Sequence, residues 1–337
     1  MMNPNEFLPT GSPIYALPTW DNSHLFITAE SKEELWKRSA FYPAFRLRAK
    51  LYKLTLRIRL LLLGNPRINY HTQNTIPSFL KAKGYSHYSP VAVLKGTRGP
   101  TQKWILQLEN SFGDISAYLK FAVKIYARSA LKNEYLMLSN LPEGLAPRPL
   151  AFSETDDGVA LLLEAIQGKP LPVRKSIHNS VLDYMKSMPF HNFQTDIHPW
   201  LQACKDAGAP QNWIKTLSER SHEVIPYHGD FAPWNLIKKP DGKLCAVDWE
   251  FGKMLGFPGA DLAYYLLQTA SLYYQWSPIR ARAHAVRTLE ALSWLGLKKN
   301  EAEALVKLTA YFGYQQSINL GNLPGEKLQK WQMGIWQ

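Results

Sequence analysis

The sequence predicts an α+β fold in which a small β-rich lobe is followed by a larger helical lobe. Short apolar runs separated by turn residues fill residues 89–167, which is typical of paired strands. Beyond Gly168 the apolar residues recur at helical spacing in most segments. One segment interrupts those helices, YHGDFAPWNLIKKPDGKLCAVDWE, and it carries acidic and amide side chains where a core segment has none.

Length and composition limit the possible classes of protein. A chain of 337 residues is long enough for two lobes, and 46% apolar with 20% charged residues is typical of a folded enzyme and excludes a disordered chain. The formal net charge of +12 indicates attraction to an anionic partner, which could be nucleotide phosphate, nucleic acid or an acidic membrane surface. The histidines lack metal-ligand spacing and the 2 cysteines are far apart, so no zinc site is expected.

The sequence pattern predicts a cytoplasmic protein. The first residues, MMNPNEFLPTGSPIYALPTW, lack the basic and apolar regions of a signal peptide. The run of leucines from Leu60 to Leu63 is too short to span a bilayer. We therefore expect a reduced, cytoplasmic setting and no integral membrane protein.

Residues 1–70 are predicted to form an N-terminal extension, irregular up to about residue 40 except for a short helix at residues 31–39. The segment FRLRAKLYKLTLRIRLLLLG then predicts a basic amphipathic helix. Its apolar stripe and its cationic row share one helical spacing: Leu47, Leu51, Leu54, Ile58 and Leu61, and Arg46, Lys50, Lys53 and Arg57. Three interpretations stay open: a surface helix packed on its own domain through the stripe, a helix that docks peripherally on the inner face of an anionic membrane, and a helix that binds nucleic acid.

Residues 71–167 are predicted to form the β-rich lobe. Its expected strands are a hairpin in PVAVLKGTRGPTQKWILQLE, a third strand in AYLKFAVKIYA, and two more in LAPRPLAF and GVALLLEAIQG. A helix is expected in RSALKNEYLMLSNL, between the third and fourth strands. Residues 168–337 are predicted to form the helical lobe.

Three side chains in the helical lobe indicate a phosphotransfer site. Asp230 and Asn235 are five positions apart in HGDFAPWN, and Asp248 ends the apolar run LCAVDW. Phosphotransfer enzymes use such an Asp to orient the acceptor hydroxyl, with an Asn and a second Asp to bind Mg²⁺. The turn KKPDGK predicts that the carboxylates meet across a β-hairpin. The alternative gives each residue a structural role, as a helix cap, a turn residue and a buried carboxylate.

Together HGDFAPWNLI, LCAVDWE and GFPGADLAYYL resemble the aminoglycoside phosphotransferase and choline kinase group, over roughly residues 85–330. The resemblance implies a protein-kinase-like two-lobe fold that uses ATP and Mg²⁺. It implies Asp230 as the catalytic residue and Asn235 and Asp248 as the Mg²⁺ ligands. His228 and Asp261 are then structural supports of the catalytic loop.

The same resemblance implies further nucleotide contacts. The group has a lysine on the third strand of the small lobe, paired with a glutamate of the following helix. Lys124 and Glu134 are predicted for these roles, with Lys120 as the alternative lysine. Backbone groups near Glu164 and Ile166, where the lobes join, are predicted to pair with adenine.

The predicted function is therefore ATP- and Mg²⁺-dependent transfer of the γ-phosphoryl group to a hydroxyl of a small molecule. Few carboxylates follow Asp261, which disfavours a polycationic aminoglycoside and favours a sugar or glycolipid-type acceptor. A catalytically silent kinase-like binding or scaffold protein is the main alternative. A protein kinase is disfavoured because HRD, DFG and APE are missing, and no nucleic acid is expected because no recognition module is found.

Overall fold

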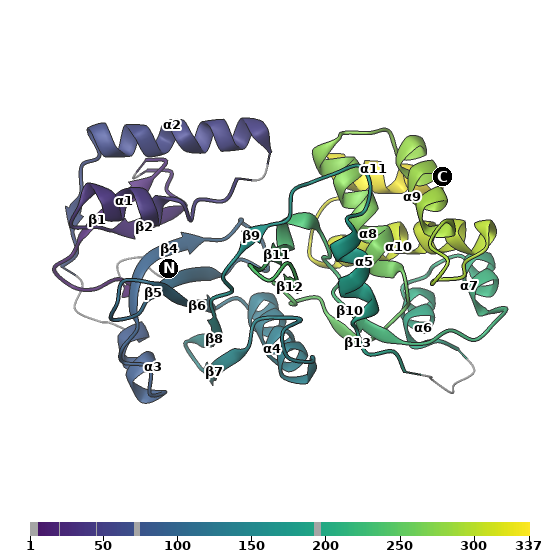
Figure 1. The fold of residues 1–337 in the computed structure, drawn as a ribbon, viewed down its shortest axis with the longest axis horizontal. Coiled ribbons are helices and arrows are strands. Elements are labelled where there is room, and N and C mark those ends of the chain that lie inside the picture. The colour runs from purple at the N-terminus through teal and green to yellow at the C-terminus, as the bar shows by residue number, and fades with distance from the viewer. Residues whose placement is uncertain (1–5, 20, 45, 71–74, 192–196) are drawn as a thin grey trace. The chain divides into compact units, whose positions relative to one another are not determined.

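The structure is a computed structural model, and it describes residues 6–19, 21–44, 46–70, 75–191 and 197–337 (Figure 1). The chain forms two compact units. The sheet unit consists of Met1–Leu131 and Pro149–Ala165, and the helical unit of Lys132–Arg148 and Ile166–Gln337. The first five residues of the predicted extension lie outside the described residues. The α+β class, with a sheet-rich part and a helical part, is confirmed.

Within the described residues, the sheet unit is built on an eight-stranded sheet in the order β3-β1-β2-β4-β5-β6-β8-β7, and each neighbouring pair is antiparallel. The strands are β1 Pro13–Leu17, β2 Leu25–Thr28, β3 Arg67–Ile68, β4 Ser89–Lys95, β5 Trp104–Glu109, β6 Ile115–Ala122, β7 Pro149–Thr155 and β8 Gly158–Glu164. The helices are α1 Lys32–Ser39, α2 Leu47–Leu63 and α3 Thr75–Ala82, followed by α4 Ile125–Asn140, whose second half belongs to the helical unit.

The N-terminal residues are more regular than the sequence pattern indicated. Strands β1 and β2 pair with each other, and β2 pairs with β4, so the sheet continues into this region. Ile14 and Ile27 are buried and supply the apolar contacts that hold these short strands. The short helix predicted at residues 31–39 is confirmed as α1, and the hydroxyl of Ser31 caps it by accepting the N–H of Glu34 at 3.1 Å.

Helix α2 is confirmed, but the interpretation in which its predicted stripe packs on its own domain holds for Leu61, which is partly buried, and is wrong for most of the stripe. Leu56 and Leu60 are the buried residues, and they belong to the apolar cluster under β1 and β2. Leu51, Leu54 and Ile58 of the predicted stripe are exposed. Leucine occupies two faces of this helix, so apolar spacing alone did not identify the buried one. The side chain of Leu47 lies outside the described part of the chain.

The helical unit contains seven complete α-helices in its described residues, and the segment of residues 227–250 lies between the third and the fourth of them. Its helices are α5 Asn179–Lys186, α6 Pro199–Asp206, α7 Gln211–Ser218, α8 Ala260–Gln268, α9 Pro278–Glu290, α10 Lys299–Asn319 and α11 Lys327–Trp336. Its short strands are β9 Lys169–Pro170, β10 Ile225–Tyr227, β11 Leu236–Lys238, β12 Leu244–Ala246 and β13 Lys253–Gly256. A 3₁₀ turn η2 at Pro233–Asn235 precedes β11, and a π turn η3 at Thr269–Tyr273 follows α8. Across the described residues, we find no helix with the length and apolar character that crossing a membrane requires.

Candidate functional site

A β-hairpin brings Asn235 and Asp248 to one end of the same pair of strands. Strand β11 pairs with β12 in antiparallel register, with Leu236 opposite Ala246. The N–H of Val247 donates to the carbonyl of Asn235 at 2.9 Å, which extends the pairing past the strand ends. Asn235 immediately precedes β11 and Asp248 follows β12, so both lie at the end of the hairpin opposite its turn. The hairpin predicted from KKPDGK is confirmed.

Asn235 is fixed against Asp230 by its amide nitrogen. Its Nδ2 donates to the backbone oxygen of Asp230 at 2.8 Å and to its carboxylate Oδ2 at 2.9 Å. Because Nδ2 makes both contacts, the amide Oδ1 is directed away from that carboxylate, and no hydrogen bond within the described residues uses Oδ1. Asn235 is buried and Asp230 is half-buried. The pair thus presents one carboxylate and one amide oxygen in a fixed orientation.

His228 connects the loop of Asp230 to the hairpin. Its side chain is fully buried, its Nε2 contacts the carbonyl oxygen of Val247 at 2.9 Å, and its Nδ1 lies 3.2 Å from the N–H of Asp230. A carbonyl only accepts and an N–H only donates, so Nε2 carries the proton and Nδ1 accepts, which is the neutral ring. The ring of Trp249 packs on it at 4.6 Å between centroids. His228 therefore holds the loop of Asp230 and the residue after β12 at one spacing.

Asp261 supports the same loop from the first turn of α8. Its Oδ2 accepts the N–H of His228 at 2.7 Å, and its Oδ1 accepts the N–H of Gly229 at 3.2 Å. Burial is the larger effect on this carboxyl and raises its pKa to about 7, although both N–H donors favour the charged form and nearby Asp230 opposes it. Asp261 is 2% exposed, so it acts on the backbone of the loop and has no access to a ligand.

Tyr264 is a site residue that the sequence did not reveal. It lies one turn after Asp261 on α8, and its hydroxyl donates to Oδ1 of Asp230 at 2.9 Å. Burial, and then the charge of Asp230, raise the pKa of the Tyr264 phenol well above its usual value, so it stays a neutral donor. The spacing of three residues on one helix face was the available signal, because such residues point the same way. Both carboxylate oxygens of Asp230 are thus hydrogen-bonded.

Asp248 stands in a left-handed backbone conformation, with φ of 72°. Asp tolerates this region better than most residues, and non-glycine residues held there often lie at functional sites. The chain beyond it is fixed by Asn133 of α4, whose Nδ2 donates to the carbonyls of Glu250 and Gly252, both at 3.0 Å. No group of three or more His, Cys, Asp and Glu side chains in the described ranges is arranged to hold a metal. The two candidate protein ligands for Mg²⁺ are one carboxylate and one amide.

The strand position predicted for Lys124 is wrong. Strand β6 ends at Ala122, and Lys124 lies beyond it, where its ammonium donates to the carbonyl of Gly99 at 2.8 Å and contacts Gln102 Oε1 at 3.3 Å. The alternative, Lys120, lies within β6 and is 7% exposed. The pairing of β6 with β8 ends at Ala122, opposite Val159, so Lys124 lies outside the strand.

The other residues predicted to contact the nucleotide are Glu134, Glu164 and Ile166. Glu134 lies on α4, as expected for the helix glutamate, and is fully buried. Glu164 ends β8 opposite Ala117, and Ile166 is the first residue of the helical unit after Ala165. The N–H of Ala165 donates to the carbonyl of Ser116 at 3.0 Å.

No family model and no curated protein matches this chain. Three solved structures that do match are an aminoglycoside phosphotransferase from Streptomyces rimosus in complex with ADP and streptomycin, a putative fructosamine-3-kinase from Haemophilus somnus and an ethanolamine kinase from Plasmodium vivax. For the first, identity is 16%, with 71% of this chain and 97% of that chain covered at a TM-score of 0.41. For the fructosamine-3-kinase, identity is 15%, with 78% of this chain and 97% of that chain covered at a TM-score of 0.44. For the ethanolamine kinase, identity is 10%, with 91% of this chain and 93% of that chain covered at a TM-score of 0.43. All three are named as kinases or phosphotransferases.

Proposed function

We propose that the protein is a phosphotransferase that moves the γ-phosphoryl group of ATP to a hydroxyl of a small molecule in the presence of Mg²⁺. The observation that carries the proposal is the fixed geometry around Asp230. Tyr264 and Asn235 each donate to one of its carboxylate oxygens, and the amide oxygen of Asn235 is left to bind a cation. A carboxylate oriented beside hard oxygen ligands is the arrangement that phosphoryl transfer needs.

Asp230 is the proposed catalytic residue. Its carboxylate accepts the hydrogen bond of the acceptor hydroxyl and aligns the attacking oxygen, and it can receive the proton as the new O–P bond forms. Two donors already occupy this carboxylate, which reduces its freedom to turn away from the acceptor. Asp261 and His228 act through the loop backbone, so they are positioning residues.

Asn235 and Asp248 are the proposed Mg²⁺ ligands. The donor set fits the ion, because Mg²⁺ prefers oxygen ligands, is commonly bound through one or two carboxylates, and takes its other ligands from phosphates and water. When bound, Mg²⁺ neutralises charge on the nucleotide phosphates. The chain's own contribution is to hold the two ligand positions at one end of the β11–β12 hairpin.

Lys120 is proposed in place of Lys124 as the lysine that binds the nucleotide phosphates. It is held within a paired strand, whereas Lys124 is exposed and bonded to the loop carbonyl of Gly99. We expect Lys120→Met to raise the Kd for ATP at least tenfold and Lys124→Met to change it less than threefold, in calorimetric titrations. The reverse order would restore Lys124. Glu134 is kept as the proposed partner residue on α4, and backbone groups near Glu164 and Ile166 as the proposed adenine contacts.

A sugar or glycolipid-type acceptor remains the proposed substrate class. The helices after Asp261 supply few carboxylates for a polycation, and Glu301 and Glu303 are already paired with Arg220 and Lys307, both at 2.8 Å. A catalytically silent binding protein is the second candidate. Against it stands the bonded geometry of Asp230, which a silent protein has no need to keep.

The test is ATP turnover measured against a panel of sugars, amino alcohols and lipid-linked sugars, with product phosphorylation read by mass spectrometry. The proposal expects one class of hydroxyl acceptor to be phosphorylated only in the presence of Mg²⁺. Tight ATP binding with no phosphorylated product across the panel, and no slow hydrolysis of ATP to ADP, would favour the silent binding protein. Phosphorylation of added proteins alone would favour a protein kinase.

A further inference from the structure

Helix α2 presents a stripe of large apolar side chains to solvent. Leu51 is 57% exposed, Leu54 44%, Ile58 45% and Leu62 74%. These positions recur at three and four residues, so the side chains line one face of the helix. The buried face, with Leu56 and Leu60, lies on the other side. Contiguous exposed apolar residues on a helix mark an interaction surface, because their exposure to water is unfavourable.

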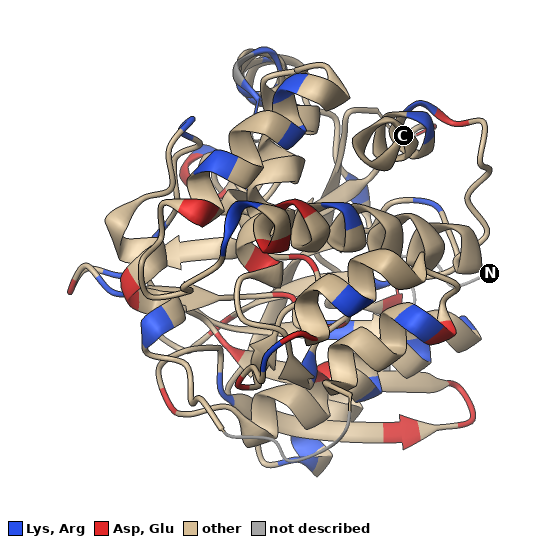
Figure 2. Cartoon of the chain, turned by 90° about the vertical axis from the view of Figure 1, so that its right-hand side faces the viewer, with Lys and Arg blue, Asp and Glu red and all other residues tan. Residues whose placement is uncertain are grey.

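Cations flank the exposed stripe, and α2 itself contains no acidic residue. Arg48, Lys50 and Arg59 are all exposed, and they lie on both sides of the stripe. The helices at the front of Figure 2 differ from α2, because they carry Asp and Glu as well as Lys and Arg. On α10, for example, Lys307 forms an i,i+4 ion pair with Glu303 at 2.8 Å. The charge on α2 is therefore of one sign.

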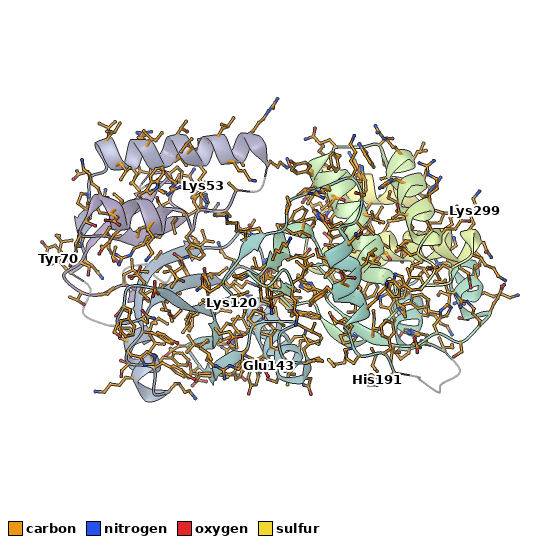
Figure 3. All side chains as sticks on the ribbon, in the orientation of Figure 1. Lys53, Tyr70, Lys120, Glu143, His191 and Lys299 are labelled. Atoms are coloured by element: carbon orange, nitrogen blue, oxygen red, sulfur yellow. The ribbon has the colours of Figure 1, made fainter. Side chains whose placement is uncertain are left out.

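Two other cations of α2 fix its orientation on the sheet unit. Lys53 lies on the side of α2 that faces α1 (Figure 3), and its ammonium donates to the carbonyl of Ala40. The Arg57 guanidinium donates to Ser39 Oγ at 2.9 Å and lies 3.6 Å from the centre of the Trp36 ring. These contacts hold the helix to α1 without using the exposed stripe. The stripe is therefore already oriented outward before any partner binds.

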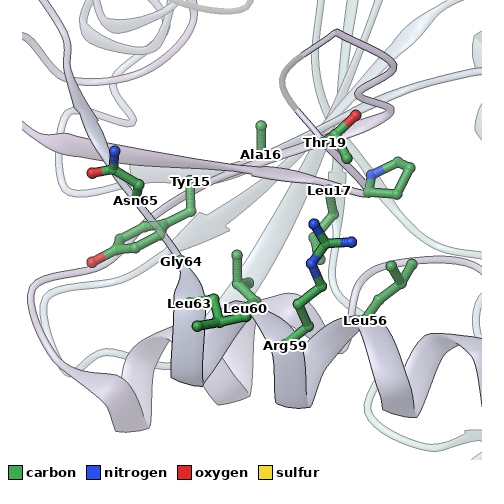
Figure 4. Close-up of a pocket in the computed structure, with 11 residues that line it drawn as sticks. Tyr15, Ala16, Leu17, Thr19, Leu56, Arg59, Leu60, Leu63, Gly64 and Asn65 are labelled. Atoms are coloured by element: carbon green, nitrogen blue, oxygen red, sulfur yellow. The ribbon is translucent and has the colours of Figure 1, made fainter.

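A cavity of about 180 Å³ lies between β1 and the C-terminal half of α2. Figure 4 shows Arg59 rising from the helix at this cavity, toward Leu17. The exposed Leu63, at 76%, forms another part of its lining. A cation and an apolar side chain thus line one hollow on the side of α2 that faces β1.

We propose that α2 docks the protein on an anionic membrane surface. The stripe enters the boundary between headgroups and acyl chains, and the flanking cations meet lipid phosphates. Nucleic acid is a poorer partner, because the apolar centre of the face would stay against a charged backbone. A second copy of the chain is also poorer, because it would bring two cationic faces together. This proposal does not depend on the chemistry of Asp230.

The test is co-sedimentation of the full chain with vesicles of neutral phosphatidylcholine, with and without 30% phosphatidylglycerol. We expect binding to the anionic vesicles that weakens as salt rises. The triple variant Arg48→Gln/Lys50→Gln/Arg59→Gln should weaken it about 100-fold, because each cation near an anionic surface contributes about fivefold. The stripe variant Leu51→Ser/Ile58→Ser/Leu62→Ser should weaken it at least tenfold, and since these residues are exposed the fold is retained.

Matched controls separate docking from bulk charge and bulk apolarity. Lys215→Gln/Lys299→Gln/Lys327→Gln removes the same charge from exposed positions of the helical unit, and Phe112→Ser removes an 87% exposed ring from the sheet unit. Both should bind like the wild type. Three outcomes would overturn the proposal: a protein that stays in the supernatant at low salt, equal binding to neutral vesicles, or equal losses in the controls. Salt-sensitive retention on RNA without vesicle binding would assign the face to nucleic acid instead.

Discussion

Replacing Asp261 with Ala should destabilise the protein by about 2–4 kcal/mol. The carboxylate accepts the N–H groups of His228 and Gly229 at 2.7 and 3.2 Å, in a place where His228 and Asp261 are 0% and 2% exposed. Each buried N–H left without an acceptor costs about 1–3 kcal/mol, which gives about 2–6 kcal/mol for the pair. Removing the carboxyl also relieves its own desolvation, so the net loss lies in the lower half of that range.

The assay is urea unfolding of the full chain followed by circular dichroism. Asp261→Asn keeps one acceptor oxygen and should lose about half as much as Asp261→Ala. Asp241→Ala is the matched control, because its carboxylate also accepts a backbone N–H, that of Lys243 at 3.0 Å, but in an exposed turn. It should change stability by about 0.5 kcal/mol or less. If Asp261→Ala unfolds within 0.5 kcal/mol of the wild type, about the size of the control, the supporting role of Asp261 is wrong.

Three further predictions concern the same loop. Asp261 has a folded pKa of about 7, which is above its unfolded value, so the folded protein keeps this proton at pH values where the unfolded chain loses it. The contribution of Asp261 to the free energy of unfolding should therefore fall by up to about 4 kcal/mol as the pH rises from about 4 to 7. Parallel pH profiles of stability for the wild type and Asp261→Asn would contradict this. Gly229→Ala should destabilise the protein by about 2–4 kcal/mol in thermal unfolding, because φ is 80° and an added Cβ would lie 2.6 Å from the carbonyl oxygen of Phe251. Gly242→Ala, at φ 84° but with open space around the added Cβ, should cost only about 1 kcal/mol. Equal losses in the two variants would refute the steric argument. Tyr264→Phe should lower kcat about tenfold at unchanged Kd for ATP, and an unchanged kcat would show that Asp230 needs no orientation by the phenol.

The candidate site was largely predictable because its residues are close in sequence. HGDFAPWN and LCAVDW lie on either side of one turn, and strand pairing across that turn fixes their meeting. Tyr264 was not predictable in the same way. Its contact with Asp230 spans 34 positions and depends on where α8 is placed, which local spacing does not determine. The bonds of Asn133 to Glu250 and Gly252 were missed for the same reason.

The fold was less predictable toward the N-terminus. Strands β1 and β2 are 5 and 4 residues long, so neither shows an alternation that distinguishes it from a loop. They are stabilised by pairing with each other and by the pairing of β2 with β4, which lies far along the chain. On α2, leucine follows two helical stripes, and the choice of buried stripe depends on contacts with β1 and β2. The position of Lys124 depended on where β6 ends, and strand ends are the least certain part of a pattern.

The central claim is that Asp230 performs the chemistry, and one comparison tests it most directly. Asp230→Asn is measured beside the wild type for turnover with the best acceptor of the panel and for ATP affinity by calorimetry. Asn keeps the size of the side chain but cannot receive the proton, so we predict turnover at least about 10³-fold lower at a Kd for ATP within about threefold of the wild type. Turnover near the wild-type rate would contradict the assignment of this site.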